Sequence, residues 1–329
     1  MRAVLCRQWG TPDTLTLEDI PSPQTGADEV LIDVKACALS FPDVLTIQGK
    51  YQIKPAFPFS PGVEVAGIIK AVGSGIGGNA GFKPGDRVFG RVANGCADEV
   101  VTKPDFLWQL PPVVGFEVGA GFAMNYGTSY YALKVRGQLK AGETLLVLGA
   151  SGGVGLAAVE LGKMLGARVI ACASTTEKLE VCKRAGADDT INYETENLRE
   201  AIKRLTQDRG VDVVYDPVGD KFADPAVRGL AWGGRYLVVG FAAGEIPKVA
   251  LNLPLLKGGA IVGVWWGGLI KNDPAQARRL TQELVNLIAD GRLKPLISAT
   301  YPLAQTGDAL ADLMARKVTG KIVVVTGDA

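Results

Sequence analysis

The segment Gly149–Gly155 contains the residues that point most directly to a chemistry. It reads Gly-Ala-Ser-Gly-Gly-Val-Gly, and it lies between the apolar run Leu145–Leu148 and a helical pattern. Gly152 would let the backbone approach a pyrophosphate, and Gly155 would let the helix pack closely on the strand. The helix N-terminus would offer free N–H groups to the phosphates. This context predicts a dinucleotide-binding loop rather than a merely tight turn, although Ala150 replaces the usual first glycine. The residues expected to contact the dinucleotide are Ser151, Gly152, Gly153 and Val154.

The end of the next strand distinguishes between the two common dinucleotides. Sites that prefer NAD place an acidic residue there, which binds the ribose hydroxyls. This sequence instead has Ser174 and Lys178, whose hydroxyl and ammonium would attract a 2′-phosphate. Glu177 is a nearby acid that would repel it, but we interpret Glu177 as a first-turn residue favoured by the helix dipole. The segment therefore predicts NADPH as the cofactor.

The composition excludes several kinds of active site and of partner. None of the 329 residues is histidine, so the chain has no histidine base, no Ser-His-Asp triad and no imidazole metal ligand. Its 35 Lys and Arg residues balance 34 Asp and Glu residues, so no charge excess favours a nucleic acid or an anionic membrane. The chemistry must come from another source, and a cofactor is the natural candidate.

Several features favour a cytoplasmic protein. The N-terminus becomes polar before the apolar core of a secretory signal could form. The two most apolar stretches do not fit a membrane span. Leu145–Leu161 is interrupted by polar residues, and Gly258–Ile270 is too short to span a bilayer. Five cysteines are scattered without a CxxC pair, as expected for reduced cytosolic thiols.

The apolar pattern changes along the chain. Residues 1 to about 120 are rich in short strands separated by Gly/Pro turns. A helix is predicted over Glu117–Leu133, and from Thr144 strands and helices alternate, which is typical of a parallel sheet covered on both faces. The tail again resembles the first region, and it contains a predicted helix over Pro274–Ala289 and a final strand over Lys321–Val325. The sequence therefore predicts an α/β protein. The strands expected in the first region are Glu29–Val34, Val63–Val72, Asp86–Val92 and Asp98–Val101.

With the glycine loop placed behind a β-rich region, the whole chain resembles the zinc-independent quinone oxidoreductases (zeta-crystallin-like) of the medium-chain dehydrogenase/reductase superfamily. This resemblance implies a GroES-like catalytic domain of residues 1–121, completed by 265–329. It also implies a Rossmann domain with a doubly wound parallel sheet over residues 122–264, the cofactor between the two, and a cytoplasmic homodimer. The segments that carry the resemblance are Ser60–Gly67, Lys83–Val88, Gly149–Gly155, Gly186–Asp188, Ile191–Tyr193 and Gly320–Lys321.

The resemblance also indicates a site without zinc. Ser40 and Val63 stand where zinc-dependent relatives have a cysteine and a histidine ligand, although Glu64 remains. The four-cysteine lobe of those relatives is also missing, and only Cys96 falls near that region. Without a Lewis acid, alcohol oxidation loses its means of stabilising the alkoxide, whereas reduction of quinones or activated alkenes does not need the metal. We therefore expect no bound metal.

Residues on the substrate side are implied by the same resemblance. Ser40-Phe41-Pro42-Asp43 matches an Asn-x-x-Asp segment that faces the nicotinamide, with the Asn replaced. Ser40 and Asp43 also form a capping box, which is our preferred interpretation and is compatible with a site role. Tyr51 matches a tyrosine of the substrate pocket, or it serves packing alone. Asn125 and Tyr126 would line the pocket, with core packing as the rival role for Tyr126.

Further cofactor contacts follow from the resemblance. Thr128 would contact the nicotinamide, and Tyr193 with Lys178 would clamp the 2′-phosphate. Gly240 and Phe241 end a strand where sheet ligands bind. Trp266 would line the nicotinamide pocket, unless it packs in the core or between subunits, and Lys321 is counted among the cofactor-binding residues.

The implied reaction is hydride transfer from NADPH to an electron-poor small molecule, with the protein contributing proximity and orientation. A hydroquinone anion could take its proton from solvent. An enolate from an activated alkene (an enone, an enoyl thioester or a 2-haloacrylate) would need donors such as Ser40, Tyr51 or backbone N–H groups. A third possibility is a non-catalytic NADPH-binding protein of the crystallin or RNA-binding type.

Overall fold

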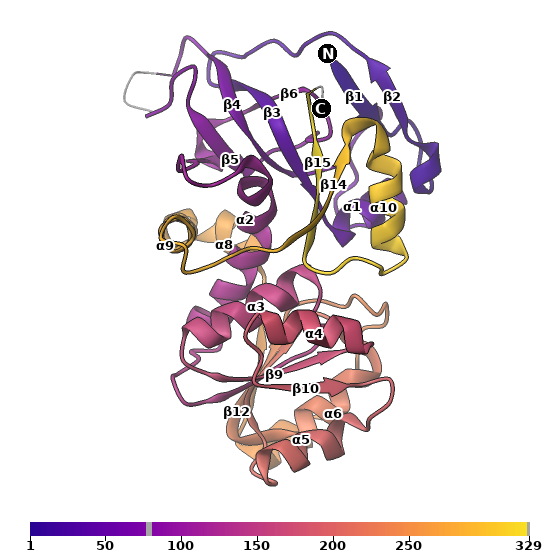
Figure 1. The fold of residues 1–329 in the computed structure, drawn as a ribbon, viewed down its shortest axis with the longest axis vertical. Helices are drawn as coiled ribbons and strands as arrows, with labels where there is room; N and C mark the ends of the chain where they lie inside the picture. Colours follow the sequence, from indigo (N-terminus) through magenta and orange to yellow (C-terminus); the bar gives the residue numbers. More distant parts are fainter. Residues whose placement is uncertain (77–80, 328–329) are drawn as a thin grey trace. The chain divides into compact units, whose positions relative to one another are not determined.

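The computed structural model describes residues 1–76 and 81–327. The chain divides into two compact units, and each is described by itself. Met1–Ala123 with Val285–Ala329 form the β-rich unit, and Met124–Leu284 form the parallel-sheet unit (Figure 1).

The β-rich unit is built on a seven-stranded sheet. The order of neighbouring strands is β14-β15-β3-β4-β5-β7, and β6 pairs with β3. A separate antiparallel ribbon pairs β1 (Arg2–Leu5) with β2 (Thr16–Asp19). The sheet strands are β3 (Val30–Leu39), β4 (Glu64–Val72), β5 (Arg87–Arg91), β6 (Glu99–Thr102), β7 (Leu107–Gln109), β14 (Ile297–Pro302) and β15 (Lys321–Val325).

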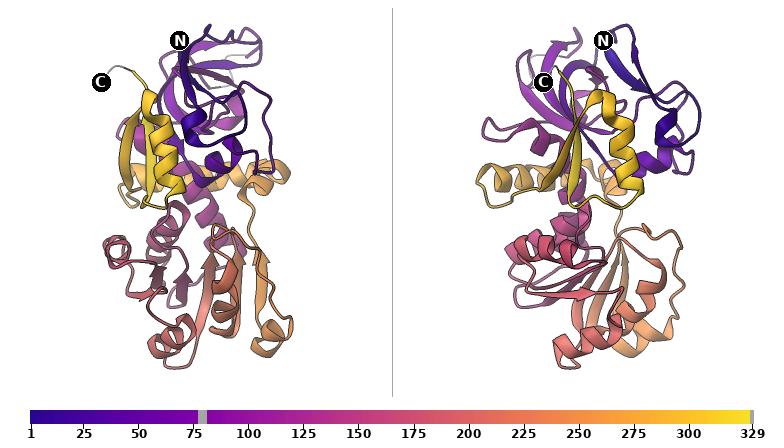
Figure 2. Two further views of the ribbon diagram at one scale, coloured as in Figure 1. Left: turned by 90° about the vertical axis from the view of Figure 1, so that its right-hand side faces the viewer. Right: turned by 45° about the vertical axis from the view of Figure 1, so that its right-hand side comes forward.

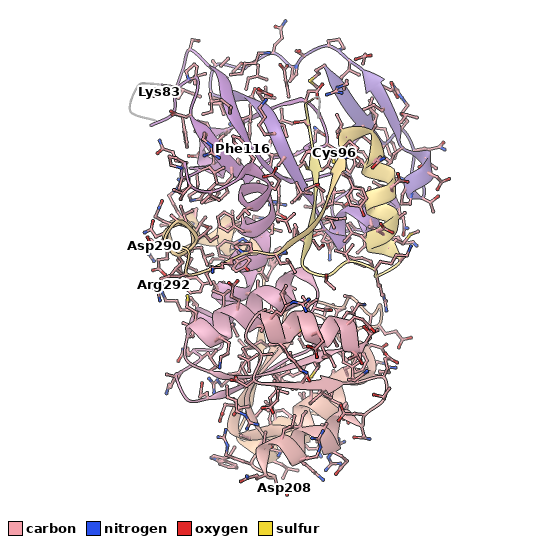
Figure 3. The ribbon with its side chains drawn as sticks, viewed as in Figure 1. Lys83, Cys96, Phe116, Asp208, Asp290 and Arg292 are labelled. Carbon is pink, nitrogen blue, oxygen red and sulfur yellow. The ribbon has the colours of Figure 1, made fainter. Side chains whose placement is uncertain are left out.

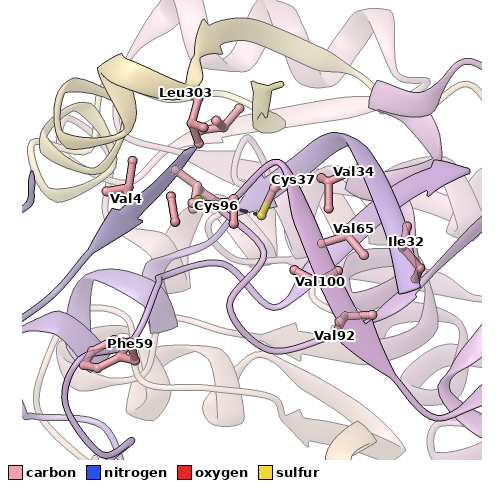
Figure 4. Packing of buried hydrophobic residues seen from close by; sticks show 14 of the residues in the cluster. Val4, Ile32, Val34, Cys37, Phe59, Val65, Val92, Cys96, Val100 and Leu303 are labelled. Atoms are coloured by element: carbon pink, nitrogen blue, oxygen red, sulfur yellow. Dashed lines mark hydrogen bonds between the residues drawn. The ribbon is translucent and has the colours of Figure 1, made fainter. Parts of the chain in front are cut away.

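The core of this unit gathers β-branched residues and thiols from these strands. Val34 and Cys37 of β3 and Val65 of β4 are at most 1% exposed, and Figure 4 shows them with Cys96. The Sγ atoms of Cys37 and Cys96 are 3.8 Å apart. Burial of such side chains stabilises the fold by about 1.5–3 kcal/mol each, which offsets the ordering of the chain.

The C-terminal segment is an integral part of the β-rich unit. β15 lies between β14 and β3, pairing parallel to the first and antiparallel to the second. Helix α10 (Thr306–Met314) packs beside α1 (Phe41–Ile47) and the short turn Pro12–Thr14, as the yellow and indigo segments in Figure 2 show. Without β15, the sheet would lose one of the neighbours of its longest strand, β3.

The parallel-sheet unit has six parallel strands in the order β10-β9-β8-β11-β12-β13. Helices α3 and α4 pack against β8, β9 and β10. Helix α6 packs against β11 and β12, and it contacts α5. Figure 1 shows α3 and α4 on one face of the sheet and α5 and α6 on the other. The elements are β8 (Thr144–Val147), α3 (Gly153–Met164), β9 (Arg168–Ala173), α4 (Thr176–Arg184), β10 (Asp189–Asn192), α5 (Leu198–Thr206), β11 (Val211–Asp216), α6 (Ala223–Arg228), β12 (Leu230–Val238), α7 (Asn252–Lys257), β13 (Ala260–Gly263) and α8 (Trp266–Asn272).

Two helices cross the division between the units. α2 (Phe116–Tyr130) ends three residues before the predicted limit at Leu133, because a π-helical turn over Tyr131–Arg136 continues it. α9 (Pro274–Ala289) has the predicted bounds. The α/β class predicted from the sequence is confirmed.

The boundary between the two units lies later in the chain than residue 265, where the β-rich domain was predicted to resume. The parallel-sheet unit extends to Leu284. Trp266 packs against Gly127, and Glu283 accepts a hydrogen bond from the Tyr130 hydroxyl at 2.8 Å. These side-chain contacts attach α8 and α9 to the end of α2. No periodicity in the sequence predicts them.

Candidate active site

The carboxyl ends of the parallel strands meet at one edge of the sheet, where open α/β sheets bind their ligands. The strand order reverses between β8 and β11, so the loops after these two strands diverge there. Asp208, which follows α5 and precedes β11, lies at the opposite edge and is labelled in Figure 3. The predicted cofactor-binding residues of β8, β9, β10 and β12 all follow the carboxyl ends of their strands.

The glycine loop after β8 has the backbone geometry predicted from its sequence. Gly149 has a φ of +56°, in the left-handed region that favours glycine. A Cβ atom on Gly155 would lie 2.2 Å from the Gly149 carbonyl oxygen, so only glycine allows α3 to approach β8 this closely. Gly152 is the N-cap of α3, whose first N–H groups have no partner within the helix. Ser151 is buried, whereas Gly152, Gly153 and Val154 are half-buried.

Side chains from α2 support this loop from one side. The amide nitrogen of Asn125 would be 2.4 Å from a Cβ on Gly153, so the buried Asn125 lies directly against the loop. Ser129 donates a hydrogen bond to the Val154 carbonyl at 2.8 Å and shares another with the Tyr215 hydroxyl. No pattern in the sequence selects Ser129, because its partners lie on other elements.

Tyr126 is buried, and its hydroxyl donates to the Glu160 carboxylate on α3. Burial, followed by the charge of Glu160, raises the pKa of Tyr126 above its usual range. This geometry favours the packing role over the substrate-lining role. Thr128, two residues further along α2, is half-buried.

Trp266 also has the contacts of a packing residue. It is 5% exposed, its ring lies against Gly127, and the centroid of the Tyr131 ring is 6.1 Å away. Its neighbour Trp265 is 71% exposed.

Ser174, Lys178 and Tyr193 are brought together at the ends of two neighbouring strands. Asn192 of β10 pairs with Ala173 of β9, so the residues that follow them, Tyr193 and Ser174, are adjacent. The Lys178 ammonium donates to the Ser174 hydroxyl at 3.4 Å. The Tyr193 ring packs against Phe222, with a centroid distance of 4.5 Å. Two hydroxyls and one ammonium are the donor set that suits a phosphate monoester.

Glu177 lies beside this group but has a role in its own helix. It is exposed, and a hydrogen bond with the Thr175 hydroxyl lowers its pKa. Thr175 is the N-cap of α4 and accepts from the Lys178 N–H at 3.3 Å. An acid in the first helical turn is favoured by the dipole, as predicted.

The loops after β11 and β12 are held together by a buried acid that the sequence did not single out. Asp216 accepts hydrogen bonds from the Val218 and Gly219 N–H groups at 2.7 and 2.8 Å, and from the Tyr236 hydroxyl. Burial raises its pKa. Gly240 donates to the Asp216 carbonyl at 3.2 Å, and Phe241 packs on Gly219. Gly240 and Phe241 thus continue the same sheet edge.

A dinucleotide with a 2′-phosphate fits this set of residues. The space beside Gly152, where a Cβ would reach only the Gly149 oxygen at 3.5 Å, leaves room for a pyrophosphate. The α3 N-terminus would supply N–H groups, and the Ser174–Lys178–Tyr193 group would supply a cation and hydroxyls.

In the β-rich unit, Ser40 and Asp43 form the predicted cap at the start of α1. The Asp43 carboxylate accepts from the Ser40 N–H at 2.8 Å and from the Gly62 N–H at 3.1 Å. Burial raises the pKa of Asp43 to about 6, against the lowering effect of the Ser40 N–H and of Lys321. Tyr51 lies beyond α1 and is half-buried.

Lys321 lies next to Ser40 within the β-rich unit. Its ammonium donates to the Ser40 hydroxyl and to the Glu64 carboxylate, the latter at 2.6 Å. The side chains of Lys321 and Glu64 are only 5% and 2% exposed. Among the residues that the structure describes, no group of three His, Cys, Asp or Glu side chains could hold a metal ion.

Two family models match successive parts of the chain. The model of the alcohol dehydrogenase GroES-like domain matches residues 26–133, and that of the zinc-binding dehydrogenase matches residues 153–284. A quinone oxidoreductase-like protein 2 homolog from Nematostella vectensis is 38% identical over 99% of this chain and 89% of its own length. The chain belongs to the quinone oxidoreductase family. The predicted family is thus confirmed, and this member of it is an oxidoreductase.

Other members of the quinone oxidoreductase family extend the similarity. The human quinone oxidoreductase is 32% identical over 99% of this chain and 98% of its own length. The Escherichia coli quinone oxidoreductase, solved in complex with NADPH, is 29% identical, with a TM-score of 0.91 over 99% of this chain and all of that one. A probable oxidoreductase from Mycobacterium abscessus is 37% identical, with a TM-score of 0.89 over 99% and 98% of the two chains. Among the described residues of this family member, no helix has the length and apolarity needed to cross a membrane.

The buried Asp43 gives this quinone oxidoreductase family member a stability that depends on pH. Because its pKa is about 6 in the folded chain and near 3.8 when unfolded, the folded state holds a proton that the unfolded state releases. The contribution of Asp43 to stability therefore falls as the pH rises from about 4 to about 6. Relative to Asp43→Asn, the wild-type protein should lose roughly 1–3 kcal/mol of unfolding free energy across this interval, measured by urea unfolding.

The exposed Asp290, labelled in Figure 3, provides the matched control in the same unit. Asp290→Asn should follow the wild-type curve at every pH. A wild-type advantage over Asp43→Asn that is constant from pH 4 to 7 would contradict the assignment.

Proposed function

We propose that this chain binds NADPH on its parallel-sheet unit and reduces small-molecule quinones. The observation that carries the cofactor assignment is the Ser174–Lys178–Tyr193 group, which joins an ammonium and two hydroxyls at the carboxyl ends of β9 and β10. The NADPH complex of the related Escherichia coli enzyme supports it. Ser151, Gly152, Gly153 and Val154 would hold the pyrophosphate, and Gly240, Phe241 and Thr128 the nicotinamide end.

When bound, the dihydronicotinamide supplies a hydride to the acceptor. The chain's residues then bind and orient the two reactants, because no histidine is present to act as a base. Ser40, Asp43, Tyr51 and Asn125 are the proposed substrate-side residues. The five cysteines are free thiols in the structure, which supports a reducing, cytoplasmic environment.

A panel of acceptors tests the reaction. NADPH oxidation should be rapid with 1,4-naphthoquinone or 9,10-phenanthrenequinone and slower with an alkyl vinyl ketone, and it should survive a chelator, because Ser40 and Val63 replace zinc ligands. The assay follows the loss of NADPH absorbance. Tight NADPH binding without turnover of any acceptor would reject the enzymatic proposal, and faster turnover of the ketone would make an activated alkene the substrate class.

The Lys178→Ala variant tests the cofactor assignment separately. Removing the ammonium should weaken NADPH binding about 10–100-fold, because a charge-assisted hydrogen bond to a phosphate is worth about 1.5–3 kcal/mol. NADH binding should stay within about twofold, since NADH lacks the 2′-phosphate. Titration calorimetry measures both constants. Lys183→Ala on the same helix, whose ammonium pairs with Glu180, is the control. Equal weakening of NADPH and NADH binding would refute the 2′-phosphate role.

We infer that two copies of the chain associate through β13. This strand is the edge of the parallel sheet, so one side of its backbone has no neighbouring strand among the residues that the structure describes. Exposed apolar side chains surround it: Ile261 is 40% exposed, and Leu255 and Leu256 of α7 are 76% and 70% exposed. Trp232, 81% exposed, packs beside Gly258 just before the strand. An edge strand with apolar flanks is self-complementary about a twofold axis, which supports a homodimer.

Ile261→Asp should therefore weaken the dimer by at least about tenfold, because a desolvated carboxylate at the contact costs several kcal/mol. Analytical ultracentrifugation measures the dissociation constant. Val113→Asp makes a comparable change at a valine that is 77% exposed on the β-rich unit, and it should leave the association unchanged. A wild-type protein that sediments as a monomer, or an Ile261→Asp dimer of unaltered stability, would argue against this surface.

A further inference from the structure

Ser40, Glu64 and Lys321 meet where three segments of the β-rich unit converge. Ser40 follows β3, Glu64 opens β4, and Lys321 opens β15. The register explains the meeting, because Leu39 pairs with Ile322 and Ala38 pairs with Glu64. A Cβ on Gly121 would lie 3.2 Å from the Lys321 Cγ, so the small residue on α2 leaves room for the lysine stem. The three polar groups are thus fixed by the sheet and by one helix.

Hydrogen-bond chemistry gives the Ser40 hydroxyl a direction. The Lys321 ammonium has three donors and no acceptor, so the Ser40 oxygen must accept from it. The proton of the Ser40 hydroxyl is then available only for another acceptor. Within residues 1–76 and 81–327, no group accepts a hydrogen bond from this hydroxyl. Ser40 is half-buried, whereas Lys321 and Glu64 behind it are buried.

Three charged side chains near Ser40, those of Lys321, Glu64 and Asp43, make different contacts. The Lys321 ammonium donates to the hydroxyl directly, and the Glu64 carboxylate accepts from the same ammonium. The Asp43 carboxylate accepts from the backbone N–H of Ser40. An ammonium bonded to a hydroxyl oxygen polarises the O–H bond and makes it a stronger donor.

We propose that Ser40 donates a hydrogen bond to the oxygen of the acceptor, and that Lys321, held by Glu64, is the positioning residue that directs and polarises the Ser40 hydroxyl. This inference rests on the proposed quinone reduction. When the hydride breaks its bond to the nicotinamide and bonds to the acceptor, both electrons enter the acceptor and its oxygen becomes an oxyanion. The Ser40 hydroxyl stabilises that charge, and the oxyanion then takes a proton from water. This assignment replaces the cofactor-binding role predicted for Lys321.

Single-turnover kinetics can separate this role from a structural one. The informative acceptors are 2-methyl- and 2-chloro-1,4-naphthoquinone, which are similar in size but give a more and a less basic oxyanion. Ser40→Ala should slow hydride transfer to the methyl compound on the order of 100-fold, with a smaller loss for the chloro compound. NADPH affinity should remain within about twofold, since the proposed partner of the Ser40 hydroxyl is the acceptor and not the cofactor.

Replacing the ion pair tests the role of Lys321. Lys321→Met with Glu64→Leu exchanges a buried pair for apolar residues of similar size, which usually preserves folding. This double variant should slow hydride transfer to the methyl compound about tenfold. Adding Ser40→Ala to it should reduce the rate no further than Ser40→Ala does alone, because Lys321 acts through Ser40. Lys317→Met, at a side chain 72% exposed, is the control. The proposal would be overturned if the rate reductions of Ser40→Ala and of the ion-pair variant multiplied in the combined variant. Equal rate reductions with the two quinones would also overturn it.

A binding measurement keeps the test independent of turnover. With NADP⁺ present, 4-nitrophenol bound to the wild-type protein should ionise at a lower pH than 4-nitrophenol bound to Ser40→Ala, as read from its phenolate absorbance. Equal ionisation in the two proteins, or no binding at millimolar nitrophenol, would reject the oxyanion role. Absence of quinone turnover together with the expected nitrophenol difference would reject only the proposed reaction.

Discussion

The close approach of Gly155 to the Gly149 carbonyl oxygen, which leaves no room for a Cβ atom, is the constraint on which the parallel-sheet unit depends. α3 can lie this close to β8 only without a Cβ atom, and its N-terminus is thereby held above the end of the central strand. Asn125 and Ser129 then pack on the same loop from α2. A wider separation would displace the helix dipole from the sheet edge and would open a void that the surrounding side chains could not fill.

The same edge of the sheet shows how much local sequence can predict. The glycine loop, Ser174, Lys178 and Tyr193 follow strands whose apolar runs are recognisable, and parallel pairing brings their ends together without any further information. Asp216 follows from no such rule, because its role comes from Tyr236 on β12 and from N–H groups of its own turn. Trp266 illustrates the same limit, since burial against Gly127 depends on the packing of two helices.

The β-rich unit was less predictable for a related reason. Its general strand positions follow from Gly/Pro turns, but the ion pair between Lys321 and Glu64 joins residues 257 positions apart. Neither residue has a neighbour in sequence that suggests a buried charge. The pair also adds little to the stability of the fold, because the desolvation of two charges largely cancels their attraction. What the pair supplies is a fixed polarity around Ser40, and the resemblance alone had assigned Lys321 to the cofactor.

The late position of β15 in the chain has a consequence for how the protein is made. β3 and β4 leave the ribosome early, but the strand that completes their sheet follows the entire parallel-sheet unit. Domains generally fold as units during synthesis, so the parallel-sheet unit can fold while the β-rich unit still lacks its closing strand. The open edge of β3 is therefore exposed on the nascent chain for most of translation, and the Ser40 environment forms only in the last step of assembly.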